Sequence, residues 1–192
     1  MRTNPILLEF TEEFETERLR IRTPRFGDGA AMNAAIRESI AELRPWMPWA
    51  QQLPSIDDSE ENVRLACLKF LERSDLRLHI FLKDTGDFIG GSGFHRINWE
   101  SRKFEIGYWI RTSQSGNGLM TEAVRGITNF AIGSLAANRV EIRCDPANLR
   151  SARIAEGLGF TLEGILRNEK CDVSGRLRHT MVFAKVRGFE FE

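Results

Sequence analysis

The spacing of apolar and polar residues changes several times along the chain, and each spacing predicts a different element. Residues 18–22 alternate strictly, which is the two-residue period of a half-buried strand. Residues 119–135 instead carry apolar side chains three, four and one positions apart, as a helix covering a core does. The same reasoning predicts helices over residues 28–41, 57–71 and 148–158, and strands over residues 78–82, 88–94, 104–111, 139–144, from 160 onward, and 180–185.

The order of these elements predicts a mixed α/β (α+β) domain built on one central sheet. Three strands follow one another directly, and residues 84–87 (Asp-Thr-Gly-Asp) read as a hairpin turn between the first two. No repeat and no Gly/Ser/Pro-rich linker divides the 192 residues, a length typical of one domain.

Charge and hydropathy exclude several classes of function. Lys plus Arg and Asp plus Glu each number 27, so the net charge is zero and gives no electrostatic reason to bind nucleic acid or an acidic membrane. No apolar stretch approaches the roughly 18 residues of a spanning helix. The first 14 residues carry acidic side chains where a secretory signal needs a basic and then apolar run. We therefore expect neither a membrane nor a nucleic acid among the partners.

The three cysteines, Cys67, Cys144 and Cys171, lie far apart and form no CxxC pair. The histidines do not cluster with them, so the pattern predicts neither a disulfide framework nor a metal site. Three reduced thiols are typical of a cytoplasmic protein.

The junction at Ser115-Gly116-Asn117-Gly118 is the most informative local pattern, because a strand runs through two glycines straight into a helix. Such a turn lets backbone N–H groups converge on an anion at the positive end of the helix, and a pyrophosphate suits that position. A plain strand-to-helix turn is the alternative. A Walker A loop is excluded because the Gly-Lys-Ser/Thr is missing, and the dinucleotide fingerprint fails because Thr121 stands at its third glycine.

The residues around this loop resemble the GNAT acetyltransferase family, and most closely its RimJ/RimL branch of ribosomal-protein N-terminal acetyltransferases. The resemblance spans roughly residues 14–187, which leaves residues 1–13 as an expected N-terminal extension to a domain over 14–192. It rests on these segments: ETERL at 15–19, WMPW at 46–49, EIGYWI at 105–110, GNGLMTEA at 116–123, NRVEIRC at 138–144, NLRS at 148–151 and GFTLEGILR at 159–167.

The resemblance implies a single GNAT-like domain whose sheet is mainly antiparallel, with one splayed parallel pair and flanking helices. The pantetheine arm of acetyl-CoA would insert into the splay, paired with the main chain of Tyr108, Trp109 and Ile110. Asn148 would contact the same arm, although it can equally cap the following helix. Ser113 departs from the family, which has Gln or Arg at this place. The pyrophosphate would bind to backbone N–H groups of Gln114, Ser115, Gly116, Asn117, Gly118, Leu119 and Met120.

Acetyl transfer to an amine requires a neutral amine, and a base helps because an α-amine titrates near about 8 and a lysine amine near about 10.4. Glu105 is the leading candidate, since it lies on the strand face opposite Phe104, Ile106 and Tyr108, just before the expected thioester position. His95, on the adjoining strand, is the second candidate. Each can instead be an ordinary structural or solvent-facing group.

The departing thiolate also needs stabilisation. Many family members place a tyrosine seven residues after the motif asparagine, but here that position is Ala155, and Tyr108 is the one tyrosine in the chain. Ser151, three residues after Asn148, resembles the RimL-like serine and could donate a hydrogen bond to the sulfur. Its alternative is a helix cap.

The resemblance therefore implies a cytoplasmic, acetyl-CoA-dependent N-acetyltransferase that acts on a protein N-terminal α-amine, for instance that of a ribosomal protein. A small-molecule amine acceptor (polyamine, amino acid or antibiotic) and a non-catalytic acetyl-CoA-binding domain are the alternatives. Family members often pair, which makes a homodimer compatible with the resemblance. Trp46, Trp49 and Trp99 either line an acceptor cleft or simply pack.

Overall fold

Eight strands form one sheet in the computed structural model, which describes residues 4–192. The order across the sheet is β1-β2-β3-β4-β5-β6-β8-β7, and β5 and β6 are parallel whereas the other neighbours are antiparallel. This confirms the predicted mixed sheet. The strands are β1 (Glu13–Glu15), β2 (Leu19–Arg22), β3 (Leu76–Leu82), β4 (Phe88–Asn98), β5 (Lys103–Ile110), β6 (Arg139–Cys144), β7 (Thr161–Cys171) and β8 (Leu177–Val186).

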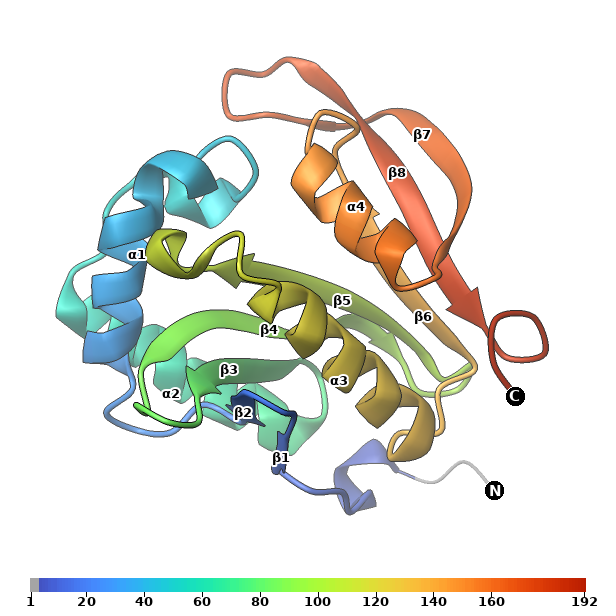
Figure 1. The fold of residues 1–192 in the computed structure, drawn as a ribbon, viewed down its shortest axis with the longest axis horizontal. Helices are drawn as coiled ribbons and strands as arrows, with labels where there is room; N and C mark the ends of the chain where they lie inside the picture. The colour runs from blue at the N-terminus through green and yellow to red at the C-terminus, as the bar shows by residue number, and fades with distance from the viewer. Residues whose placement is uncertain (1–3) are drawn as a thin grey trace.

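Helices cover both faces of the sheet (Figure 1). α1 (Gly29–Leu43) and α2 (Ile56–Glu72) pack together against β4 and β3, whereas α3 (Leu119–Gly133) and α4 (Leu149–Gly157) pack on the opposite face against β5 and β6. Short 3-10 turns lie at η1 (Pro5–Leu7), η2 (Pro48–Gln51) and η3 (Thr112–Gln114). Within residues 4–192, no helix is both long and apolar enough to cross a membrane.

The alternation along β5 determines which side chains face which helices. Phe104 and Ile106 are almost completely buried, and the Phe104 ring packs on Phe94 at 5.5 Å, which in turn stacks on Phe130 of α3. Because successive strand residues point to opposite faces, Glu105 belongs to the α1/α2 face and Tyr108 to the α3/α4 face.

The parallel pair is short, and this opens the sheet. β5 and β6 pair from Lys103↔Arg139 to Ile106↔Ile142, and residues 107–110 of β5 pair only with β4. On its other edge, β6 pairs with β8 along its whole length. The two ribbons part toward these ends (Figure 1), so the predicted splay is present and begins at Gly107.

The two ends of the chain contain elements that the sequence patterns did not predict. β1 adds a strand at the sheet edge, and the Phe10 ring packs at 5.9–6.4 Å from Phe70, Phe130 and Trp99. The Trp99 indole donates to the carbonyl of Arg73 at 2.8 Å, so this tryptophan packs and does not line a cleft. β7 runs to Cys171, and β8 begins at Leu177, before the predicted residue 180. β7 exposes nearly all its side chains, so no burial pattern indicated how far it extends.

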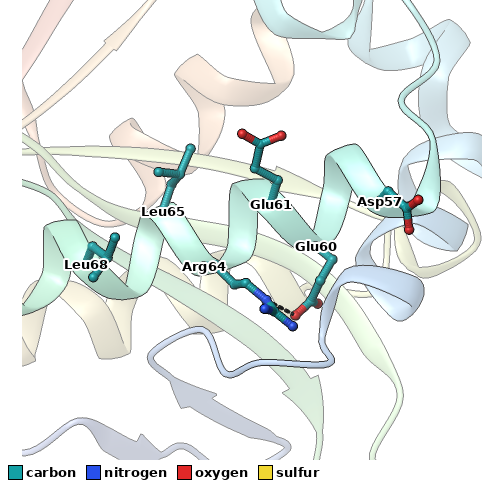
Figure 2. Close-up of a pocket in the computed structure, with 6 residues that line it drawn as sticks. All are labelled: Asp57, Glu60, Glu61, Arg64, Leu65 and Leu68. Atoms are coloured by element: carbon teal, nitrogen blue, oxygen red, sulfur yellow. Dashed lines mark hydrogen bonds and ion pairs between the residues drawn. The ribbon is translucent and has the colours of Figure 1, made fainter.

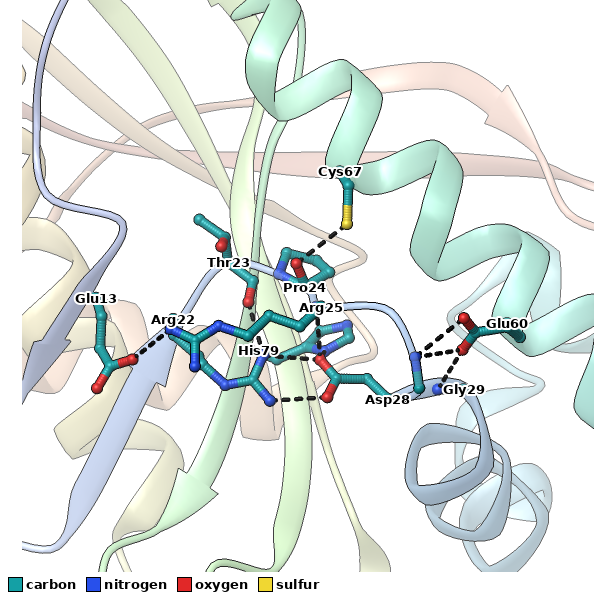
Figure 3. A network of polar contacts seen from close by, with 11 residues as sticks. Glu13, Arg22, Thr23, Pro24, Arg25, Asp28, Gly29, Glu60, Cys67 and His79 are labelled. Atoms are coloured by element: carbon teal, nitrogen blue, oxygen red, sulfur yellow. Dashed lines mark hydrogen bonds and ion pairs between the residues drawn. The ribbon is translucent and has the colours of Figure 1, made fainter.

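A buried polar network fixes the start of α1 against the sheet (Figure 3). Asp28 accepts hydrogen bonds from both terminal nitrogens of Arg22, at 2.8 and 2.7 Å, and from Nδ1 of His79 at 2.9 Å. Burial raises the pKa of Asp28, but the hydrogen bonds from His79 and Arg22 outweigh it and hold that pKa well below its usual range. Glu60 of α2 accepts from the N–H of Gly27 at the same helix start. α1 and α2 thus form a rigid cover on one face of the splay.

Candidate active site

The backbone of Tyr108, Trp109 and Ile110 lines one side of the splay, where the sequence predicted the pantetheine arm. One edge of this stretch is paired with β4 at Ser92, Gly91 and Gly90. The other edge has no partner from β6. An extended chain with amide groups can add to such an edge as a strand does.

The loop before α3 has the geometry of an anion site. Gly116 and Gly118 have φ of 85° and 75°, a left-handed conformation that glycine adopts without steric cost. No acceptor within residues 4–192 hydrogen-bonds the N–H groups of Gly116, Asn117, Gly118, Leu119 and Met120. The N–H groups of Gln114 and Ser115, also predicted as donors, bond the carbonyls of Arg111 and Thr112 within η3. Five of the seven predicted donors therefore remain for a pyrophosphate at the helix N-terminus.

Side chains from both flanks brace this loop. Arg18 donates to the carbonyl of Asn117 at 3.0 Å and pairs with Glu122 of α3 at 2.6 Å. On the other flank, Glu38 of α1 accepts from the N–H of Ser113 at 2.8 Å. Hydrogen bonds from Ser113 and then from Arg111 lower the pKa of Glu38 to about 2. Ser113, which departs from the family pattern, thus connects the loop to α1 through its backbone N–H.

On the α3/α4 face, two hydroxyl groups meet beside the splay. The Ser151 N–H donates to the side chain of Asn148 at 3.2 Å, so Asn148 is the cap of α4 and the Ser151 hydroxyl is not. That hydroxyl lies 2.9 Å from the Tyr108 hydroxyl, which also donates to the Ser151 carbonyl at 3.1 Å. Burial raises the pKa of Tyr108 far above its usual range, although the bond to Ser151 opposes the shift, and the phenol stays protonated.

Sequence reasoning missed this use of the Tyr108 side chain, because it assigned only the main chain of that residue. The available signal was the face that Tyr108 shares with Phe104 and Ile106, which points it at the helices of the α3/α4 face. Cys144 of β6 lies near the same hydroxyl pair. Burial raises the pKa of its thiol, and hydrogen bonding with Ser151 partly opposes that change.

On the α1/α2 face, Glu105 and His95 lie on neighbouring strands, as predicted, and the register makes them direct cross-strand partners. Glu105 is largely buried and forms an ion pair with Arg96 at 3.2 Å. Nδ1 of His95 lies 2.6 Å from a carboxylate oxygen of Asp75, a residue that no sequence pattern singled out. Burial raises the pKa of Asp75, but the hydrogen bond and charge of His95 outweigh it and lower that pKa.

The predicted catalytic groups thus lie on opposite faces of the splayed strand. Glu105 and His95 are on the α1/α2 face, and Ser151 is on the α3/α4 face. A group held in the splay can therefore meet a proton acceptor on one side and a hydrogen-bond donor on the other. The arrangement suits attack on a carbonyl with departure of an anion.

Two tryptophans extend the α1/α2 face outward from the splay. Trp109 crosses over Gly91 of β4 and packs on Phe88 at 5.8 Å. Trp49 of η2, 48% exposed, meets Trp109 edge to face at 5.9 Å. Of the three candidate cleft residues, Trp46, Trp49 and Trp99, only Trp49 both lies at the surface and contacts a residue of the splay within residues 4–192.

A shallow hollow on α2 lies apart from this chemistry (Figure 2). Glu60 and Arg64 in it are tied to each other by an ion pair of 3.0 Å, and it contains no residue of β5, the glycine loop or α4. The hollow is lined by Asp57, Glu60, Glu61, Arg64, Leu65 and Leu68.

Comparisons with known proteins identify the family of the chain. The family model described as an acetyltransferase (GNAT) domain matches residues 18–161. An uncharacterised N-acetyltransferase, p20 of Bacillus licheniformis, is 34% identical over 59% of this chain and 64% of its own length. The putative ribosomal N-acetyltransferase YdaF of Bacillus subtilis is 28% identical over 92% of this chain and 94% of its own. The ribosomal-protein-serine acetyltransferase of Escherichia coli is 28% identical over 67% of this chain and 73% of its own.

Solved structures show the same fold. The RimL ribosomal L7/L12 α-N-protein acetyltransferase in complex with coenzyme A superposes with a TM-score of 0.83, at 22% identity over 91% of this chain and 98% of that one. The microcin C7 self-immunity acetyltransferase MccE in complex with acetyl-CoA and AMP gives 0.82, at 23% identity over 90% and 94%. The chain therefore belongs to the GNAT acetyltransferase family and is an acetyl-CoA-dependent N-acetyltransferase.

Proposed function

We propose that this enzyme acetylates the N-terminal α-amine of a protein, with a ribosomal protein as the expected class of acceptor. The observation that carries the proposal is the likeness to a putative ribosomal N-acetyltransferase over 92% of the chain. A second relative, matched over 67% of the chain, is named for the same kind of substrate.

The chemistry of the α-amine agrees with the groups at the site. An α-amine titrates near about 8, so a carboxylate or an imidazole can remove its proton, whereas a lysine side chain near about 10.4 would need a stronger base. Glu105 and His95 supply the proton acceptor in this proposal, directly or through one water. The exposed Trp49, beside Trp109, offers the incoming peptide an apolar contact.

The transfer proceeds by attack of the neutral amine nitrogen on the thioester carbonyl. The acetyl end of the donor lies near Gly107, because the pantetheine arm runs from the pyrophosphate at the glycine loop back along residues 110–107. The new carbon–nitrogen bond forms as the amine proton passes to the base. The carbon–sulfur bond then breaks, and the Ser151 hydroxyl donates a hydrogen bond to the coenzyme A thiolate.

Ser151 acts as an electrostatic stabiliser in this proposal, because a hydroxyl is a far weaker acid than a thiol of pKa about 8.5. Asn148, which orients the first turn of α4, holds Ser151 in place. Leu119 and Met120 begin α3 with buried side chains, so their N–H groups are fixed toward the pyrophosphate.

The test is mass-resolved acetylation of a mixed panel: peptides with free N-termini, ribosomal-protein fragments and small amines. Thiol release and product mass are measured together for the wild type, Glu105→Gln, His95→Gln and Ser151→Ala. Acetylated peptide α-amines, with turnover reduced by the Ser151 change and by at least one base change, are the expected result. Transfer to small amines alone would sink the proposed acceptor and leave the enzyme class untouched.

Two further expectations accompany the proposal. The reaction is placed in the cytoplasm, where thiols stay reduced, in keeping with three free cysteines. A homodimer, which the family resemblance makes compatible, is tested by sedimentation velocity, where a single monomeric species across micromolar concentrations would reject it.

A further inference from the structure

A half-buried carboxylate and an imidazole form a pair beside the splay on the α1/α2 face. Asp75 directly precedes β3, and His95 lies in β4; Oδ2 of Asp75 and Nδ1 of His95 are 2.6 Å apart. The side chains are 21% and 34% exposed, respectively. Oδ1 of Asp75 is buried and unpartnered, so within residues 4–192 the imidazole is the one side-chain donor to this carboxylate.

This contact decides which nitrogen of the ring carries the proton. A carboxylate can only accept, so the neutral imidazole must hold its hydrogen on Nδ1. The lone pair is then on Nε2, which is free to take a proton. Asp75 also stabilises the positive charge that the ring acquires when it does so.

Gly107 shows where Nε2 points. A Cβ atom built at position 107 would lie 3.1 Å from Nε2 and 3.0 Å from Cδ2 of His95, so the ring edge lies directly over this glycine. Gly107 is also the first β5 residue beyond the last pair with β6, Ile106↔Ile142. The free nitrogen therefore faces the point where the splay opens, which is where the proposed path of the donor places its acetyl end.

We infer that Asp75 is a positioning residue that holds His95 as the general base of the acetyl transfer. The inference rests on the proposed site chemistry but not on the class of acceptor. Nε2 takes the proton from the amine nitrogen as that nitrogen bonds to the carbonyl carbon. The carbon–sulfur bond then breaks, the thiolate leaves, and the imidazolium returns its proton to the thiolate or to solvent.

Several other charged groups lie around the pair of His95 and Asp75. Glu105 of β5 is the cross-strand neighbour, but Arg96 of β4 holds its carboxylate in an ion pair. Arg77 of β3 and Lys69 of α2 act on Asp75 from the other side. Asp75 is therefore the carboxylate that contacts the ring directly, and Asp75→Asn removes its charge while keeping its shape.

The experiment compares Asp75→Asn, His95→Gln and Glu105→Gln, with Asp84→Asn in the exposed β3–β4 turn as the matched control. The measurement is kcat against pH at saturating acetyl-CoA, on whichever amine of the panel is the best acceptor. We expect His95→Gln to lower kcat about 10²-fold or more and to abolish its acid limb. Asp75→Asn should lower kcat about tenfold, leave KM for acetyl-CoA unchanged and move the acid limb to lower pH. Glu105→Gln should keep the limb.

A purely structural pair would lower thermal stability in Asp75→Asn without moving the pH profile, and that result would overturn the inference. So would loss of the acid limb in Glu105→Gln with its retention in His95→Gln. A readout without turnover is the ¹⁵N signal of the His95 ring. The Nδ1–H tautomer is expected in the wild type and its loss in Asp75→Asn, and an Nε2–H tautomer in the wild type would equally overturn the inference. The acceptor panel alone decides the substrate class, so failure of the proposed function can be distinguished from failure of this inference.

Discussion

Replacement of Tyr108 by phenylalanine tests whether the two hydroxyl groups beside the splay act in series. The Tyr108 hydroxyl lies 2.9 Å from the Ser151 hydroxyl and 3.1 Å from the Ser151 carbonyl. The protonated phenol has one hydrogen and two acceptors within reach, the carbonyl and the hydroxyl of Ser151. When the phenol donates to the hydroxyl, the Ser151 hydrogen is free to point at the thiolate. The change to phenylalanine removes one oxygen and keeps the ring and the strand.

The magnitude follows from the contacts that are lost. Tyr108→Phe deletes a neutral hydrogen bond, which contributes about 0.5–1.5 kcal/mol to stability. On turnover the loss is indirect, since Ser151 keeps its own hydroxyl. If weaker polarisation of the Ser151 hydroxyl raises the activation free energy by about 0.7–1.4 kcal/mol, kcat falls about threefold to tenfold. Ser151→Ala removes the donor itself, for which a loss of about 10²-fold is expected.

The assay is a double-mutant cycle on kcat, read by thiol release at saturating acetyl-CoA. If the hydroxyl groups act in series, Tyr108→Phe has almost no further effect once Ser151 is alanine, less than about twofold. KM for acetyl-CoA should stay unchanged, because the main chain of residue 108 still lines the splay.

An equal loss in both backgrounds would refute this reasoning and show that Tyr108 acts without Ser151. A rise in KM with unchanged kcat would assign the phenol to binding of the donor. No change in any constant would show that the pair is structural.

Three other predictions follow from contacts that support the site. Asp28→Asn breaks a largely buried ion pair and should lower the free energy of unfolding by about 3 kcal/mol or more, measured by urea denaturation against Asp84→Asn. Because the pKa of Asp28 is depressed, the contribution of this carboxylate to stability is complete above about pH 3.9 and declines as the pH falls below that value. The unfolding free energies of the two variants should therefore converge at low pH, and a constant difference would contradict this dependence on the Asp28 charge. Gly107→Ala should lower kcat about tenfold by displacing the histidine ring above it, whereas Gly164→Ala, where a Cβ meets nothing within 4 Å, should not; equal kcat values would place the ring elsewhere. Arg18→Ala removes the hydrogen bond from Arg18 to the Asn117 carbonyl, which braces the glycine loop. It should raise KM for acetyl-CoA about threefold to tenfold in steady-state kinetics, with kcat nearly constant, and a fall in kcat alone would exclude a binding role.

Strong periodicity explains which elements the sequence predicted well. β6 occupies the predicted residues 139–144, and α3 starts at the predicted Leu119, because both bury one complete face. β1 has three residues, too few to show a period. β7 exposes almost every side chain, so its extent depends on pairing with β8 and not on a hydrophobic pattern. Strand pairing is a tertiary property that local spacing does not contain.

The residues of the candidate site differ in the same way in whether a local sequence pattern indicated them. The sequence singled out the glycine loop and Asn148 because backbone geometry makes local demands on residue type, namely positive φ at Gly116 and Gly118 and a cap at the start of α4. Asp75 was missed because it meets His95 from 20 residues away, and the Tyr108 side chain was missed because Ser151 lies 43 residues away. Contacts of this range exist only after the sheet has formed.

The alternation of β5 is what separates the two halves of the proposed chemistry. Residues 105 and 107 face α1 and α2, residue 108 faces α4, and the splay opens between them at the end of the pairing with β6. A slip of one residue in β5 would exchange the two faces; if it brought Tyr108 under His95, it would bring Trp109 to the position beside Ser151. The fully buried Phe104 and Ile106 oppose that slip, since it would remove both side chains from the core on the α3/α4 face. The apolar residues of β5 therefore position the proposed acid–base groups as well as the core, because Glu105 lies on the strand between the buried Phe104 and Ile106.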